Sequence, residues 1–173
     1  RRAGPAQDRC RRFAESLQDL LTAVRLAPDD PVPHYQLGWF LSRHGSSMAV
    51  AELQTCLDKD PEHLDSLIQL GVTRAERGEL RQAEAHLQAA LRLDPSDPIA
   101  NHEFGALLLD QGRVHEAISH LRFAMEEMAG DREILLDLAL AYQQAGFLEQ
   151  ARAILEDQVL KRDPADLHAH YHL

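Results

Sequence analysis

Several residue types are scarce in this chain, and each shortage excludes a class of protein. Cys10 and Cys56 are the two cysteines among 173 residues, too few and too isolated for a disulfide framework or a cysteine-rich metal site. No apolar run approaches the roughly 18 residues of a membrane span, and none has the pattern of a signal-peptide core. Basic residues number 18 against 28 acidic ones, a net charge of -10. This charge disfavours nucleic acid as a partner, because such binding depends on Lys and Arg neutralising phosphates.

Aromatic residues are also few, at 5%, whereas hydrophobic residues make up 45% and charged residues 27%. Leu and Ala supply most of the apolar side chains, and both favour α-helices. The composition therefore predicts a soluble helical chain with enough apolar side chains to bury a core. It does not fix the compartment, for which the cytoplasm is the default expectation.

A proline followed ten residues later by a glycine recurs along the chain. The pairs are Pro28–Gly38, Pro61–Gly71 and Pro95–Gly105, and they start 33 and 34 residues apart. A fixed period of this length indicates stacked copies of one supersecondary unit, a solenoid and not a globule. The units are residues 31–63, 64–97, 98–131 and 132–166, the fourth being one residue longer than the third. Each is predicted to fold as helix, short turn, helix.

Small residues recur at matching positions of the first helix. A large residue precedes a small one, which lets two helix backbones approach closely, at Leu37-Gly38, Leu70-Gly71, Phe104-Gly105 and Leu138-Ala139. The first helices are predicted to end at Gly45, Gly78, Gly112 and Gly146, since glycine adopts the left-handed conformation at no steric cost. Asp30-Pro31 and Asp97-Pro98 predict an N-cap followed by a first-turn proline.

The second helix of each unit carries a ladder of its own. Its members are Ala49, Ala83, Ala117 and Ala151, then Leu53, Leu87, Leu121 and Leu155 four residues on, then Cys56, Ala90 and Ala124. Spacings of four and three place them on one helical face. With the Leu-Gly pairs, these residues resemble the tetratricopeptide repeat (TPR) family over nearly the whole chain. The resemblance implies an all-α superhelix, a TPR solenoid of antiparallel helix pairs, A and B, with helix A lining the concave face.

Both ends contain part of a repeat. Residues 1–30 are predicted to be a tail plus a half-repeat with a lone helix B, and residues 167–173 look like the start of a further helix A. We therefore expect one TPR solenoid over residues 1–173. It is either cut from a longer protein or has open apolar ends that stack on another copy.

No catalytic, cofactor-binding or metal-binding motif is identified in the sequence: it contains no Walker loop, no nucleophile elbow and no His-Glu-x-x-His. Cys56 occupies an alanine position of the helix B ladder, which predicts a small buried residue and not a nucleophile. The alternating His168, His170 and His172 could bind a metal, but ordinary helix A positions are the preferred interpretation. Cys10 lies in an arginine-rich stretch and is expected to be a surface thiol. We therefore expect no enzymatic activity, no cofactor and no metal.

The face of helix A that stacking leaves unused predicts a binding groove. Residues four apart share a helical face, and the rows that fall here are Tyr35, Ile68, His102 and Leu136, then Trp39, Val72, Ala106 and Leu140, with Leu109 beside them. A contiguous exposed apolar strip usually marks a binding surface, although neighbouring helices could instead cover these residues as core. The flanks carry Asp65, Glu103, Asp110, Glu133 and Asp137, which would steer a basic ligand or belong to the ordinary surface of an acidic chain.

The sequence therefore predicts a non-catalytic scaffold for protein–protein interaction. It would hold a basic, partly apolar peptide in the helix A groove, with Tyr35 and Trp39 as anchors because aromatic residues dominate binding hot spots. Two alternatives stay open. One is an assembly scaffold that forms homo-oligomers through its open ends, and the other is the substrate-recruiting arm of a larger enzyme.

Overall fold

The computed structural model describes residues 5–172, with side chains from Arg11 onward, so the Cys10 thiol lies outside the described side chains. The described residues form helices and no strand, which confirms the predicted all-α fold. In chain order the elements are α1 (Pro5–Leu26), α2 (Pro31–Arg43), α3 (Ala49–Lys59), α4 (Leu64–Glu76), α5 (Leu80–Leu93), α6 (Pro98–Asp110), α7 (Val114–Glu127), α8 (Arg132–Gln144), α9 (Leu148–Ile154), the π-helical η1 (Leu155–Leu160) and α10 (Leu167–Tyr171).

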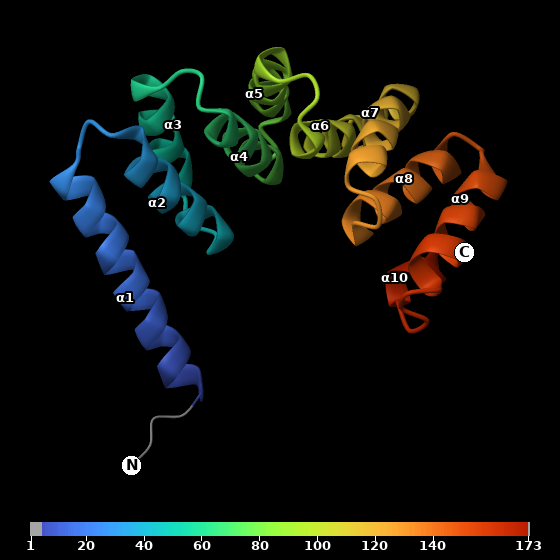
Figure 1. Ribbon diagram of the computed structural model, residues 1–173, viewed down its shortest axis with the longest axis horizontal. Helices are drawn as coiled ribbons and strands as arrows, with labels where there is room; N and C mark the ends of the chain where they lie inside the picture. The colour runs from blue at the N-terminus through green and yellow to red at the C-terminus, as the bar shows by residue number, and fades with distance from the viewer. Residues whose placement is uncertain (1–4, 173) are drawn as a thin grey trace. The chain divides into compact units, whose positions relative to one another are not determined.

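The chain divides into two compact units, Arg1–Glu79 and Leu80–Leu173. In the first unit α1 packs on α2, α2 on α3 and α3 on α4. In the second unit the same order continues from α5 to α9, with α10 against η1. Within each unit, helices adjacent in the chain lie side by side (Figure 1). The single domain expected over residues 1–173 stays a prediction.

The N-caps and glycine turns predicted from the sequence are present at the ends of the helices. Asp30 caps α2 by accepting a hydrogen bond from the Val32 amide at 2.9 Å, and Asp97 caps α6 by accepting one from the Ala100 amide at 2.6 Å. Helices α2, α4, α6 and α8 are followed by glycines with positive φ, namely Gly45 (67°), Gly78 (75°), Gly112 (74°) and Gly146 (82°). The predicted caps and turns are confirmed.

In the first and third repeats, helix A lies in close contact with its own helix B. A Cβ atom placed on Gly38 would lie 2.7 Å from Cγ of Leu53, and one on Gly105 would lie 2.7 Å from Cγ of Leu121. Both leucines are fully buried. Each of these two glycines is therefore a notch that a leucine of helix B fills, which confirms the close backbone approach predicted at Leu37-Gly38 and Phe104-Gly105.

Cys56 is buried, as the sequence predicts. Its sulfur accepts a hydrogen bond from the Ser66 hydroxyl at 3.0 Å. Burial raises the pKa of the Cys56 thiol above its ordinary value, an effect that the Ser66 hydrogen bond only partly offsets. The thiol therefore stays protonated and packs as a small apolar side chain.

The extra residue of the fourth repeat has a structural counterpart. Helix α9 passes directly into the π-helical turn η1 at Leu155. A π-helix closes its hydrogen bonds over five residues instead of four, so it absorbs one inserted residue without breaking the helix. Leu155 and Val159 stay buried through this turn, and the inserted residue therefore leaves the apolar face of the helix in place.

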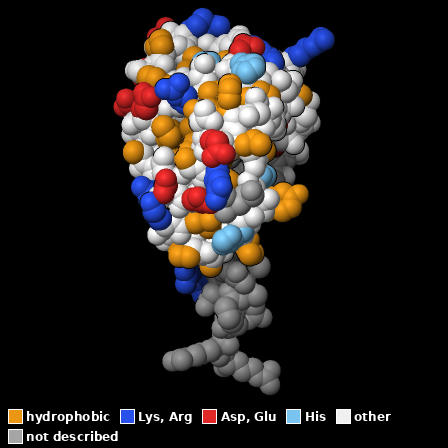
Figure 2. Space-filling view, turned by 90° about the vertical axis from the view of Figure 1, so that its right-hand side faces the viewer, with side chains coloured by type: hydrophobic (Ala, Val, Ile, Leu, Met, Phe, Trp, Pro, Cys, Tyr) orange, Lys and Arg blue, Asp and Glu red, His pale blue; other side chains and the backbone are white. Residues whose placement is uncertain are grey.

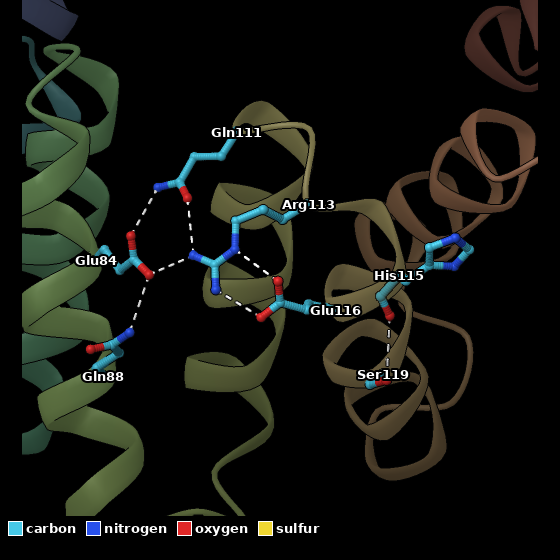
Figure 3. Close-up of polar contacts among 7 residues, drawn as sticks. All are labelled: Glu84, Gln88, Gln111, Arg113, His115, Glu116 and Ser119. Carbon is cyan, nitrogen blue, oxygen red and sulfur yellow. Dashed lines mark hydrogen bonds and ion pairs between the residues drawn. The ribbon is translucent and has the colours of Figure 1, made fainter.

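A polar network joins α5 to α7 within the second unit (Figure 3). The Arg113 guanidinium lies between two carboxylates, with Nη1 at 2.6 Å from Glu84 Oε1 and Nη2 at 2.7 Å from Glu116 Oε2. Gln111 donates to Glu84 at 3.3 Å and accepts from Arg113 at 3.2 Å. These contacts connect the B helices of consecutive repeats, so the network has a structural role.

Candidate binding site

Helices α6, α8 and α10 of the second unit surround a cavity of about 380 Å³, here called the α6–α8 hollow. It is lined by His102, Glu103, Ala106, Arg132, Glu133, Leu136, Asp137, Leu140, His168 and His172. Seven of these ten were predicted as groove residues from the sequence. The structure therefore brings half of the predicted site together in one place.

The apolar part of the α6–α8 hollow comes from three side chains. Leu136 and Leu140 lie one turn apart on α8, and Ala106 lies on α6. All three are half-buried, so they keep apolar surface that a ligand could cover. Such a surface accepts an aliphatic side chain, or the hydrocarbon stem of a long charged one.

Acidic side chains lie around this apolar surface. Glu133 and Asp137 are one turn apart on α8, and Glu103 is on α6. His102 reaches across from α6 and hydrogen-bonds Asp137, with Nε2 at 2.9 Å from Oδ2. Burial lowers the pKa of His102, but the Asp137 hydrogen bond and the negative charges of Glu103 and Asp137 outweigh it, so the net shift is upward. The hollow therefore favours positive charge.

The arginine that lines the hollow is already paired. Arg132 contacts Asp166 through Nε at 2.5 Å and Nη2 at 3.1 Å. Asp166 also caps α10 by accepting hydrogen bonds from the amides of His168 and Ala169, each at 3.0 Å. The Arg132 hydrogen bonds, followed by that of Ala169, lower the pKa of Asp166 to about 2. The Arg132 charge is thus balanced by Asp166, and the carboxylates of Glu103, Glu133 and Asp137 set the sign of the hollow.

This negative charge is local. Figure 2 shows one face of the molecule, on which acidic, basic and histidine side chains are interspersed with apolar ones and no sign dominates. The chain as a whole is acidic, but a cation would be held by the carboxylates nearest to it, because charges beyond about 10 Å are screened at ordinary salt.

The first unit carries a smaller, apolar cavity of about 240 Å³, here called the α1–α2 hollow. It is lined by Leu20, Tyr35, Gln36, Trp39 and Phe40. Trp39 is 41% exposed, and the Arg43 guanidinium lies 5.1 Å from the centre of its ring. Tyr35 packs against the His63 ring. Burial, and then the charge of Asp65, raises the pKa of the Tyr35 hydroxyl.

Five predicted groove residues line neither hollow: Asp65, Ile68, Val72, Leu109 and Asp110. Ile68 is only 6% exposed and Leu109 only 7%, so these two belong to the core and offer a ligand almost no surface. Neighbouring A helices contact each other, α2 with α4 and α6 with α8. We attribute the burial of Ile68 and Leu109 to these contacts, which corrects the expectation that both are exposed.

Six lining residues were not among the predicted groove residues: Leu20, Gln36, Phe40, Arg132, His168 and His172. A signal for three of them is present in the sequence. Gln36 and His172 occupy the repeat position of Glu103 and Asp137, one residue after the Tyr35 row. Arg132 stands one helical turn before Leu136, so the same row of α8 includes it.

The described residues contain no group of three or more His, Cys, Asp and Glu side chains placed to hold a metal ion. The histidine triplet is separated instead: His170 hydrogen-bonds the Pro164 carbonyl at 2.8 Å, and His172 contacts Gln143 at 3.2 Å. Among the same residues, no helix is both long and apolar enough to cross a bilayer.

Sequence comparison assigns the repeats to a family. Two family models described as tetratricopeptide repeat match the chain, one over residues 40–98 and 68–126 and the other over residues 108–172. The matches together span most of the sequence, and the chain belongs to the tetratricopeptide repeat family. No curated protein sequence matches it.

Solved structures of TPR proteins share the fold. The structure of YrrB, described as a TPR protein with an unusual peptide-binding site, superposes with a TM-score of 0.75 at 19% identity, over 88% of this chain and 79% of that one. MamA from Desulfovibrio magneticus gives 0.76 at 20% identity, over 92% of both chains. A thermophilic TPR protein from Thermus thermophilus gives 0.72 at 24% identity, over 92% of this chain and 88% of that one. The chain is therefore a TPR solenoid, a fold that serves generally as a scaffold for protein–protein interaction.

Proposed function

We propose that this chain is a non-catalytic module that binds a peptide segment carrying basic and apolar side chains, and that the α6–α8 hollow is the main binding site. The observation that carries the proposal is the composition of that hollow. Leu136, Leu140 and Ala106 form an apolar surface, and the carboxylates of Glu103, Glu133 and Asp137 surround it.

The chemistry of a fitting ligand follows from these side chains. An arginine guanidinium pairs with carboxylates through two parallel hydrogen bonds, while its stem covers apolar surface. An aliphatic residue next to it in the peptide would remove Leu136 and Leu140 from water, at about 25 cal/mol for each Å² buried. Opposite charge also speeds association. A neutral or acidic peptide would gain only the apolar part.

The α1–α2 hollow supports a second contact point in the first unit. Its side chains are aromatic or aliphatic apart from Gln36, and Trp39 keeps a large exposed area. Aromatic residues in such positions contribute more than their share of binding energy. We assign Tyr35 and Trp39 to an apolar anchor of the ligand. That a TPR protein of the same fold is described as having a peptide-binding site makes this mode of binding reasonable for the present chain.

The test uses random twelve-residue peptides displayed on phage and selected on the immobilised protein. Peptides enriched in Arg or Lys beside Leu, Ile or Val are expected. Their affinities are then measured by calorimetry for the wild type and for Glu133→Lys, which reverses one charge of the hollow. Charge reversal removes an attraction worth up to about 1 kcal/mol and adds a repulsion of similar size, so the affinity should fall about fivefold or more.

A matched control is available in the same unit. Glu149 lies in the first turn of α9, as Glu133 lies in the first turn of α8, and both are exposed. Glu149→Lys makes the same charge change away from the hollow and should leave the affinity unchanged. Selection of peptides without basic residues, or equal losses in the two variants, would refute the proposed site.

A further inference from the structure

The charges of the chain are unevenly distributed along it. Residues 1–12 contain five arginines, Arg1, Arg2, Arg9, Arg11 and Arg12, against the single acid Asp8, a net charge of +4. The rest of the chain therefore carries a net charge of -14. The same twelve residues include Ala3, Pro5 and Ala6, so the segment is both basic and partly apolar.

The described part of this segment is accessible. Arg11 and Arg12 are exposed on α1. Arg11 pairs with Glu15 one turn further along the helix, and the two side chains are 77% and 57% exposed. An exposed pair of this kind contributes little to stability and is readily exchanged for another partner.

We propose that the peptide held in the α6–α8 hollow is the arginine-rich segment, residues 1–12, of a second copy of this chain. This inference rests on the proposed function and names its partner. The argument is charge complementarity: the segment is the part of the sequence that combines clustered arginines with small apolar residues, and the hollow combines Glu103, Glu133 and Asp137 with Leu136 and Leu140.

Each copy offers one segment and one hollow, so two copies can exchange segments reciprocally in a closed dimer, or the contacts can continue head to tail into rings or filaments. Because the contact relies on exposed charges, the association should weaken as the salt concentration rises. This mode differs from stacking of the apolar ends, which salt would not weaken.

Sedimentation velocity of the full chain over a range of protein concentrations tests the proposal under reducing conditions, which keep Cys10 from forming disulfides. The wild type should shift to larger species with concentration. Glu133→Lys should weaken the association about fivefold or more, and so should the combined variant Arg9→Gln, Arg11→Gln and Arg12→Gln. Glu149→Lys, which makes the matched charge change outside the hollow, should associate like the wild type.

A second measurement separates this inference from the proposed function. A labelled synthetic peptide with the sequence of residues 1–12 is titrated against the protein and its fluorescence anisotropy recorded. It should bind the combined arginine variant, whose own segment competes less because three of its five arginines are replaced. Addition of Glu133→Lys to that variant should weaken peptide binding about fivefold.

The outcomes are distinct. If the wild type stays monomeric at all concentrations, a second copy is not the partner. This holds even if the peptide of residues 1–12 binds, because the segment then docks within its own chain. If residues 1–12 fail to bind but selected basic peptides bind in a Glu133-dependent way, the partner is another protein and the proposed function stands. If no basic peptide binds, both proposals fall.

Discussion

The close contact between α6 and α7 at Gly105 determines whether a Gly105→Ala substitution stabilises or destabilises the protein. Replacing Gly105 by alanine in the middle of a helix should by propensity alone stabilise the protein by about 1 kcal/mol. The added methyl group would lie 2.7 Å from Cγ and 2.9 Å from Cδ2 of Leu121. Leu121 is fully buried, so its side chain can shift only by displacing its neighbours in a close-packed core. Overpacking a core in this way costs about 1–3 kcal/mol, so we expect Gly105→Ala to be neutral or to destabilise by up to about 2 kcal/mol.

The assay is urea unfolding followed by far-UV circular dichroism, with a partner substitution that removes the clash. Leu121→Ala alone should cost about 2–5 kcal/mol, because it leaves a cavity. In that background Gly105→Ala should become stabilising, since the space is empty and the propensity gain remains. If Gly105→Ala stabilises the wild type by the full propensity gain, the close approach of α6 and α7 is not a constraint and the reasoning fails.

Three further predictions concern the hollows. The pKa of His102 is raised, so the pairing of His102 with Asp137 should stabilise the fold fully below the unfolded pKa of histidine, about 6.5. This contribution is lost as the pH rises through the raised pKa. Thermal melts of the wild type and His102→Gln at several pH values should therefore converge at high pH. Basic-peptide affinity should fall on acidification, and less so in His102→Gln. Because the pKa of Asp166 is about 2, the pairing of Asp166 with Arg132 stabilises the fold above the unfolded pKa of aspartate, and this stabilisation is lost as the pH falls towards 2. At neutral pH, Asp166→Asn should speed amide exchange in α10 and not elsewhere in the second unit. Trp39 is the single tryptophan, so its emission should shift when a selected peptide fills the α1–α2 hollow, and Trp39→Ala should weaken that peptide by more than about 1 kcal/mol; an unchanged spectrum at saturation would exclude Trp39 from the contact.

The sequence predicts the fold well because each structural signal recurs at the same position of several repeats. A glycine at a helix end is weak evidence by itself, but Gly45, Gly78, Gly112 and Gly146 fall at equivalent positions and all have positive φ. The same holds for the buried ladder of helix B, where Leu53, Leu87 and Leu121 are almost fully buried. Repetition turns local propensities into a consistent architecture.

The candidate site is predicted less completely, because exposure depends on how far apart neighbouring helices stand. Ile68 and Leu136 occupy the same repeat position, yet Ile68 is 6% exposed and Leu136 is half-buried within a hollow. Their side chains are almost equal in size, so the sequence does not distinguish them. Cross-repeat polar contacts are equally hidden: His102 and Asp137 are 35 residues apart and meet only when α6 and α8 pack.

In the first and third repeats, the glycine notch and the leucine that fills it come from the same repeat: Gly38 and Leu53 lie within residues 31–63, and Gly105 and Leu121 within residues 98–131. Duplicating or deleting either of these repeats therefore leaves its notch and its leucine together. Only the contacts between successive repeats have to be rebuilt. During evolution such a chain can lengthen or shorten in steps of one repeat, and each added repeat brings a new A helix whose exposed face can diverge without disturbing the fit inside the repeat.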